Sequence, residues 1–368
     1  MRRICVVGDS ITDSSGSPTL NPGPAWSYWP EVLLHKLERI WGDVRLFNNA
    51  QSGCRTDDGG LSGGTSTGML NRFQPSFIGA PDIVIIEGSA NDIKSVTQLT
   101  STGTTGTVNI PAHGLCLTGQ SVLGEIFGAT PAGYNIADVV FSYVDANNLS
   151  YTVPAGLGSP ATGTIRLRMQ TKRNIRALIK WAKFGCIGSY RSQADLPSDG
   201  VDGDRYVVLS DTSTTGGIAA VASDQQPTIT GSADSSDPTV WELRRTCSGE
   251  TGWGRVANAS TKYFSGANRP QVFVLGYHYL NYSANGDTQS TPYALYDDVS
   301  GLRKQQIDAA AAEGATYIDL YAFLKSRIAG GLDTQGSYGW HVADGDHHFN
   351  VYGHSLVSEC VYQAIQNS

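Results

Sequence analysis

The chain has 368 residues, of which 40% are hydrophobic and 16% charged, a balance typical of a folded protein with a large core. Its formal net charge is −7 and it has no basic stripe, so nucleic acid is not an expected partner. No apolar run approaches the ~18–20 residues that span a bilayer, so membrane insertion is not expected either.

The N-terminal part of the chain has the pattern of an α/β domain. The apolar run at residues 4–7 predicts a strand, and the spacing of apolar residues over 29–41 predicts an amphipathic helix. A short strand is predicted at 44–47. The almost continuous apolar run at 82–87 predicts a strand buried on both faces, as in a parallel sheet.

The pattern changes to β structure after Asn91-Asp92. Residues 100–168 are rich in Thr, Gly and Pro, with short alternating runs at 139–144 and 149–153. The stretch VNIPAHGLCLTGQSVLGEIFGATPAGYN resembles a small β-module found repeatedly in phage and surface proteins, which carries Pro-x-His-Gly-Leu, Thr-Gly-Gln and Tyr-Asn turns. This resemblance implies an inserted β-module.

The rest of the chain returns to helices and strands after one more β-rich stretch. Helical spacing covers 171–184, and β patterns then extend over roughly 187–262. The elements predicted after that are a strand at 272–276, a helix at 293–313 ended by Gly314, a strand at 317–320 and a helix near 353–366.

The simplest organisation is one discontinuous α/β domain interrupted by two β-rich inserts. Insertion at surface loops costs little closure entropy, so this arrangement is physically reasonable. The predicted α/β domain comprises residues 1–99, 169–186 and 263–368, and the inserts comprise 100–168 and 187–262.

Four polar segments stand at or just beyond the ends of predicted strands. They are Gly8-Asp9-Ser10-Ile11, Asn49-x-x-Ser52-Gly53, Ser89-Ala90-Asn91-Asp92 and the segment DGDHHFNVYGH at 344–354. Because the carboxyl ends of strands in an open parallel sheet converge on one crevice, these segments are expected to meet there.

This ordered set resembles the four sequence blocks of the SGNH, or GDSL-type, serine hydrolase superfamily. The resemblance covers the discontinuous α/β domain and not the inserts. It implies a flavodoxin-like three-layer α/β/α sandwich with a parallel sheet, to which two small all-β modules are added. It also implies an esterase that needs no cofactor and no catalytic metal.

The family's roles map onto this chain residue by residue. Ser10 would be the nucleophile, His348 its general base and Asp344 the carboxylate that orients the histidine, as such a triad requires. The oxyanion would be held by the Ser10 N–H, the Gly53 N–H and the Asn91 side-chain amide.

Two departures from the family pattern affect this assignment. Ser89 stands where the third block usually has Gly, which bears on the local backbone. The last block has one extra residue, because Gly345 lies three residues before His348. The favoured pair is Asp344 with His348, and Asp344 with His347 and Asp346 with His348 remain as alternatives. The same acidic and histidine cluster matches no common zinc spacing.

The resulting hypothesis is an esterase that removes a short acyl group, such as acetyl, from a carbohydrate of a bacterial surface. The alternatives are a non-catalytic carbohydrate-binding or structural phage-tail module with a vestigial hydrolase domain, and a lipolytic enzyme or thioesterase. The expected partner is an acylated carbohydrate or small ester, with a homo-oligomer or a virion tail assembly as further options.

Two remaining observations concern location and substrate. The first residues lack the apolar segment of a signal peptide, so either export is not by that route or a leader is missing from this sequence. The expected location is a virion tail, or else the cytoplasm or extracellular space as a soluble protein. Aromatic residues that could rim the crevice, and stack on sugars, are Trp26, Tyr28, Trp29, Tyr277, Tyr279, Tyr282, Tyr338 and Trp340.

Overall fold

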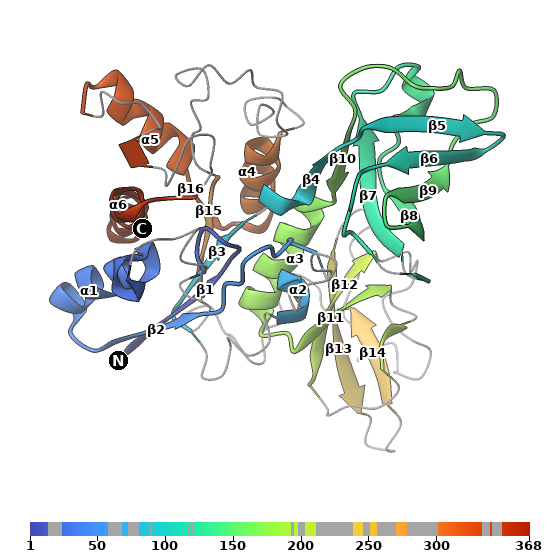
Figure 1. The fold of residues 1–368 in the computed structure, drawn as a ribbon. Helices are drawn as coiled ribbons and strands as arrows, with labels where there is room; N and C mark the ends of the chain where they lie inside the picture. The colour runs from blue at the N-terminus through green and yellow to red at the C-terminus, as the bar shows by residue number, and fades with distance from the viewer. Residues whose placement is uncertain are drawn as a thin grey trace.

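A computed structural model describes most of the chain, in three sheets and the helices around them (Figure 1). The described residues are 1–13, 24–57, 68–72, 81–88, 90–116, 118–119, 121–192, 195–197, 203–210, 238–245, 251–255, 270–277, 301–332, 339–340 and 348–368. Within this part of the chain, no helix is long and apolar enough to cross a membrane.

The central sheet is parallel and has five strands in the order β16-β15-β3-β1-β2. This is the flavodoxin-like strand order, with its switch point between β1 and β3. The strands are β1 (Arg2–Val7), β2 (Val44–Asn48), β3 (Ile83–Glu87), β15 (Gln271–Leu275) and β16 (Thr316–Ile318). The predicted fold class is therefore confirmed.

Helices cover both faces of this sheet and bury two separate apolar clusters. Strand β3 shows why, because Ile83 and Ile85 face one cluster whereas Val84 and Ile86 face the other. The helices of one face are α1 (Trp29–Trp41), α5 (Leu320–Ala329) and α6 (Val351–Gln366). Those of the other face are α3 (Thr171–Phe184) and α4 (Leu302–Glu313).

A seven-stranded sheet with its own apolar core follows β3 in the chain. Its order is β4-β10-β7-β8-β9-β6-β5 and all its pairings are antiparallel. Its strands are β4 (Ile93–Ser95), β5 (Gln98–Thr102), β6 (Thr105–Asn109), β7 (Ser121–Phe127), β8 (Val139–Asp145), β9 (Asn148–Thr152) and β10 (Arg166–Met169). We call it the first inserted sheet; it begins at Ile93, a few residues before the predicted insert.

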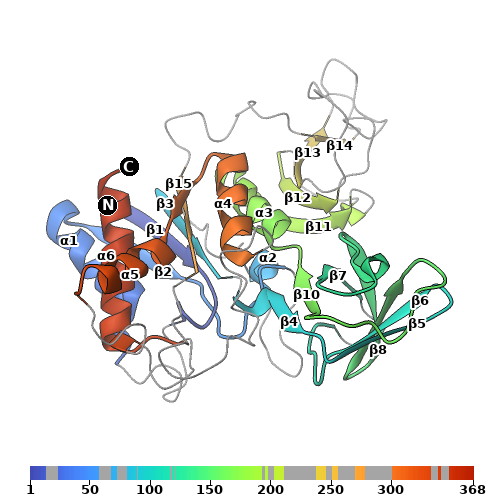
Figure 2. The same ribbon diagram turned by 90° about the horizontal axis from the view of Figure 1, so that it is seen from above.

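A four-stranded sheet, which we call the second inserted sheet, packs directly on α3. It consists of β11 (Gly188–Ser192), β12 (Arg205–Ser210), β13 (Thr239–Arg245) and β14 (Thr251–Arg255). Val207, Leu209 and Val240 belong to the same apolar cluster as the buried side of α3. This sheet therefore shares one core with α3 and the parallel sheet. Both inserted sheets lie on the α3 side, away from α1 and α6 (Figures 1 and 2).

The C-terminal elements differ from the sequence predictions in two places. Helix α5 was not predicted, and it starts at Leu320, where a strand was expected to end. The Asp319 carboxylate accepts a hydrogen bond from Ala322 N at 3.0 Å and caps this helix, which stops β16 at Ile318. Gly314 ends α4 in the left-handed conformation, as predicted, with φ +61°.

Four short helical segments complete the described part. Segments η1 (Ala25–Ser27) and η3 (Ala90–Asp92) precede α1 and β4, whereas α2 (Met69–Arg72) and η4 (Ala132–Tyr134) lie in loops. The predicted helix at 293–313 is described only from Leu302 onward, and its earlier residues lie outside the described part.

Candidate active site

The ends of β1 and β2 are tied together at the carboxyl edge of the parallel sheet. Asn49 N donates to Val6 O at 2.8 Å, and Gln51 N donates to Gly8 O at 3.0 Å. These bonds continue the strand pairing beyond β1 and bring the segments that carry Ser10 and Gly53 side by side, as the sequence predicts for neighbouring parallel strands.

Ser10 stands in a tight turn that Asp9 stabilises. The Asp9 carboxylate accepts a hydrogen bond from Ile11 N at 3.0 Å, and Asp9 O accepts from Thr12 N and Asp13 N at 3.1 and 2.9 Å. Aspartate favours such local side-chain to backbone bonds, so the Gly-Asp-Ser sequence itself converts the end of β1 into a turn. The turn holds the Ser10 hydroxyl at the end of the strand.

His348 meets that hydroxyl from the opposite end of the chain. Its Nε2 lies 2.9 Å from Ser10 Oγ, and each residue is only 5% exposed. His348 lies two residues before Asn350, which caps the first turn of α6 by accepting from Gly353 N at 2.9 Å. Asn350 N in turn donates to Trp340 O at 2.8 Å. His348 is therefore close to a helix start that these hydrogen bonds hold in place.

Gly53 and Asn91 flank the same segment after β2. Gly53 has φ +74°, a conformation that favours glycine, and no described residue accepts a hydrogen bond from its N–H. Asn91 Nδ2 donates to Cys54 O at 2.9 Å. A primary amide carries two N–H groups, so this bond leaves the second one for another acceptor.

The carboxylate of the expected triad lies outside the described residues. The same is true of Asp346, His347 and Ser89. The Ser10–His348 contact is therefore the part of the triad that can be described. Among the described residues there is no group of three or more potential metal ligands.

Residues 6–186 match the model of the GDSL-like lipase/acylhydrolase family. The chain therefore contains a GDSL-like lipase/acylhydrolase domain. It is a carboxylic ester hydrolase. The matched region contains Ser10, Gly53 and Asn91 and ends before His348.

Comparisons with other proteins add the following. Similar solved structures include the lipase/acylhydrolase from Enterococcus faecalis, at 14% identity and a TM-score of 0.41, covering 100% of this chain and 96% of that one. They also include TesA, at 13% identity and a TM-score of 0.41, covering 100% of this chain and 99% of that one. A search of curated proteins finds no match.

A second histidine of this GDSL-type hydrolase, His354, lies near His348. His354 is 2% exposed, and its ring packs edge-on against Tyr28 and Phe349 at 5.0 and 5.8 Å between centroids. Burial, together with the nearby His348, lowers the pKa of His354 to about 3. This second ring is therefore neutral at ordinary pH and adds no positive charge beside His348.

A buried carboxyl pair beneath Ser10 was missed by the sequence analysis. Glu87 ends β3, and its Oε2 accepts from Asp9 N at 3.2 Å and from Thr12 Oγ1 at 2.8 Å. Burial and the adjacent Asp9 carboxylate raise the pKa of Glu87 well above its usual range. Because two carboxylates cannot both be charged cheaply at such close range, Glu87 keeps its proton and supports the turn that carries Ser10.

Replacing Glu87 by Gln should leave the folded state intact and make its stability less dependent on pH. The raised folded-state pKa means that the contribution of Glu87 to stability declines as pH rises from its ordinary value near 4.5. Gln resembles the protonated acid but does not titrate, so the variant should gain stability relative to the wild type as the pH rises above about 4.5. Urea unfolding at several pH values measures this difference.

Glu87→Leu serves as the matched control, since it keeps the volume but removes the acceptor for Asp9 N and Thr12. It should be destabilised at every pH, by roughly 1–3 kcal/mol. A stability difference between wild type and Glu87→Gln that stays constant with pH would show that Glu87 is ionised in the folded protein.

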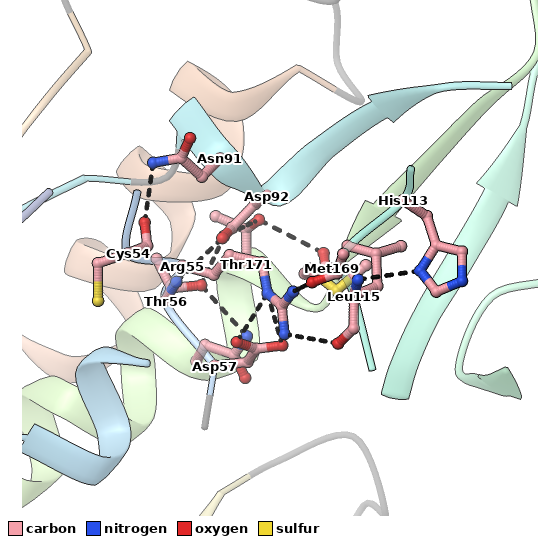
Figure 3. Close-up of polar contacts among 12 residues, drawn as sticks. Cys54, Arg55, Thr56, Asp57, Asn91, Asp92, His113, Leu115, Met169 and Thr171 are labelled. Carbon is pink, nitrogen blue, oxygen red and sulfur yellow. Dashed lines mark hydrogen bonds and ion pairs between the residues drawn. The ribbon is translucent and has the colours of Figure 1, made fainter. Parts of the chain in front are cut away.

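Asp92, which directly follows Asn91, is a buried carboxylate that links two distant segments. It is fully buried and accepts from Thr56 N at 2.9 Å, Thr56 Oγ1 at 2.5 Å and Thr171 Oγ1 at 2.7 Å (Figure 3). Asn174 Nδ2 adds a bond to Thr56 Oγ1 at 3.2 Å. Asp92 thus joins the segment after Gly53 to the start of α3.

Among the aromatic residues proposed to rim the crevice, most of those that the structure describes are packed inside the protein. Tyr28, Trp29, Tyr277 and Trp340 are buried, and Trp29 Nε1 donates to Thr12 Oγ1 at 3.1 Å. Tyr279, Tyr282 and Tyr338 lie outside the described residues. Trp26 is the exception among those described, because 66% of its surface is exposed.

Proposed function

We propose that this hydrolase is a serine esterase that removes short acyl groups, and acetyl in particular, from a carbohydrate through an acyl-enzyme. The observation that carries the proposal is the buried contact of 2.9 Å between Ser10 Oγ and His348 Nε2. A serine hydroxyl is a poor nucleophile on its own, and an imidazole in hydrogen-bond contact is the usual means of activating it.

In the proposed mechanism, Ser10 Oγ attacks the ester carbonyl carbon while its proton moves to His348 Nε2. The tetrahedral intermediate then collapses: the bond to the alcohol oxygen breaks, and His348 returns its proton to that oxygen. The sugar alcohol leaves and the acyl group stays on Ser10. Water repeats the sequence on the acyl-enzyme, giving the carboxylic acid and free Ser10.

The proposed oxyanion hole consists of the Ser10 N–H, the Gly53 N–H and the second N–H of Asn91 Nδ2. The positive φ of Gly53 and the Asn91 bond to Cys54 O support this role, because they fix two of the donors at the segment that is paired with the end of β1. The loss of one such donor typically lowers kcat about 10²–10³-fold.

The proposed carboxylate is Asp344, which would accept a hydrogen bond from His348 Nδ1–H and fix the tautomer that faces Ser10. The contact of His348 with Ser10 supports His348 over His347 as the base. Asp346 remains the alternative acid, and comparing Asp344→Asn with Asp346→Asn in the same assay separates the two.

The proposal also specifies a carbohydrate as the substrate. Trp26 supports it, since an exposed indole ring is suited to stack on a sugar. Its segment adjoins the site, because Trp29 contacts Thr12 and Tyr28 packs on His354. The likeness of the first insert to modules of phage and surface proteins is the reason to propose a tail component that deacetylates a bacterial polysaccharide.

The decisive experiment measures acetate release from a panel of O-acetylated polysaccharides, with the wild type beside Ser10→Ala. p-Nitrophenyl esters of increasing chain length are assayed in parallel. We expect acetate release and a preference for acetyl over long chains. A preference for long chains would instead identify a lipolytic enzyme or thioesterase. No turnover, together with no labelling of Ser10 by a fluorophosphonate probe, would leave a binding module with a vestigial site.

Trp26→Ala tests the sugar contact separately. It should raise KM for the acetylated polysaccharide roughly 10-fold, which corresponds to a sugar-stacking contribution of about 1.4 kcal/mol. It should leave p-nitrophenyl acetate turnover unchanged. Trp26→Phe keeps an aromatic face and serves as the control. Equal KM values for all three proteins on the polysaccharide would exclude Trp26 from substrate binding.

A further inference from the structure

We propose that the first inserted sheet helps to position the active site. One of its turns contacts Arg55 and thereby holds the segment after Gly53 in place. Arg55 is then a positioning residue. This inference rests on the proposed oxyanion role of Gly53 and Asn91. Figure 3 shows the residues involved.

Arg55 connects the two parts of the protein with its whole guanidinium group. It is 1% exposed, and its Nε donates to both carboxylate oxygens of Asp57, at 3.0 and 3.2 Å. Its two terminal nitrogens reach the first inserted sheet, where they donate to Gly114 O at 3.3 Å and Leu115 O at 3.0 Å. The charge is balanced locally by Asp57, while the direction of the fork is set by the two carbonyls.

The turn that offers these carbonyls is itself tightly fixed to the β8–β9 hairpin. His113 Nδ1 accepts from Leu115 N at 3.0 Å and its Nε2 donates to Asp145 O at 2.8 Å. Ala112 N donates to Asn147 Oδ1 at 2.8 Å. The bond to His113 therefore sets the orientation of the peptide between Gly114 and Leu115, and with it the position of Gly114 O, one of the two oxygens that Arg55 contacts.

On the hydrolase side, the segment that Arg55 belongs to carries one proposed oxyanion donor, Gly53, and contacts another, Asn91. Gly53 lies two residues before Arg55, and Asn91 donates to the carbonyl of the intervening Cys54 at 2.9 Å. Arg55 O accepts from Met69 N at 2.9 Å, and Thr56 is held by Asp92. The insert thus forms one of the supports that fix the backbone between Gly53 and Asp57.

A positioning role and a purely structural role differ in their kinetic consequences. Oxyanion donors bind the transition state more strongly than the ground state, so displacing them lowers kcat and leaves KM nearly unchanged. A loss of folding would instead lower the amount of active enzyme and its melting temperature, with the kcat of the folded fraction unchanged.

The test compares Arg55→Lys and His113→Ala with the wild type on p-nitrophenyl acetate. Lys keeps the charge opposite Asp57 but cannot donate to both carbonyls, and His113→Ala alters only the inserted turn. We expect each variant to lower kcat about 10–100-fold with KM within about threefold, as partial loss of oxyanion stabilisation predicts. His35→Ala, on the exposed surface of α1, is the matched control and should retain wild-type kcat.

Hydrogen exchange of the peptide that covers residues 49–57 gives a readout independent of activity. We expect faster exchange in both variants, because the support from the insert is weakened. Unchanged kcat and unchanged exchange in correctly folded variants would overturn the inference. If the wild type has no turnover, the proposed function fails, whereas faster exchange in the variants would still establish the contact as a support of this segment.

Discussion

Replacing Ser10 by Ala should lower kcat/KM for p-nitrophenyl acetate by at least about 10³-fold, and His348→Ala should lower it by a similar factor. The two side chains are proposed to act as one unit, since the hydroxyl at 2.9 Å from Nε2 becomes nucleophilic only as its proton moves to the imidazole. Neither group should retain much of its effect without the other.

The double variant Ser10→Ala/His348→Ala provides the sharper measurement. Its activity should equal that of either single variant, because residues that act together give strongly non-additive losses. His347→Ala is the matched control and should keep its activity within about threefold. A double variant whose loss equals the product of the single losses would show that the two residues act independently, and a large loss in His347→Ala would restore His347 as a candidate base.

Replacing Asp92 by Ala should destabilise the folded protein by about 2–4 kcal/mol at neutral pH. The change leaves three donors, on Thr56 and Thr171, in a fully buried site without their acceptor. Thermal or urea unfolding measures the loss. Asp92→Asn keeps an acceptor of the same shape and should lose less. Equal stability of Asp92→Ala and the wild type would mean that water or a neighbouring group satisfies these donors.

The same carboxyl group predicts a pH dependence with a definite sign. Burial raises the pKa of Asp92 to about 6, above its ordinary value of 3.8. The folded protein therefore binds this proton more tightly than the unfolded chain does, and its stability should decline between about pH 4 and pH 6. The decline should be absent from Asp92→Asn. The stability difference between these two proteins, measured from pH 4 to 7, isolates the contribution of Asp92 from that of other groups.

The parts of the fold that depend on local sequence were predictable. Apolar periodicity gave α1 and α3 with the observed bounds, and the continuous apolar run gave a strand with both faces buried. Helix α5 was missed because its start depends on the Asp319 cap, which follows too closely on the short strand β16. The division into one discontinuous domain with two inserts remains a prediction.

The candidate site likewise contains residues that the local sequence indicates and residues that it does not. Ser10, Gly53 and Asn91 could be found because each follows a predicted strand, and parallel strands bring their ends together. Glu87 and Arg55 were missed, since their partners come from distant segments and no local pattern indicates them. One signal was available: an acidic residue at the end of an apolar run, as Glu87 is, must find an unusual environment when the strand is buried.

The second inserted sheet sets a limit on how far this hydrolase can be trimmed. Val207, Leu209 and Val240 complete the apolar cluster around α3, and Arg205 donates to Phe184 O at 3.2 Å at the end of that helix. Deleting residues 188–255 to obtain a minimal enzyme would therefore expose the outer side of α3 to water. A shortened version would need polar replacements on that side of the helix, so the insert cannot be deleted without redesigning α3.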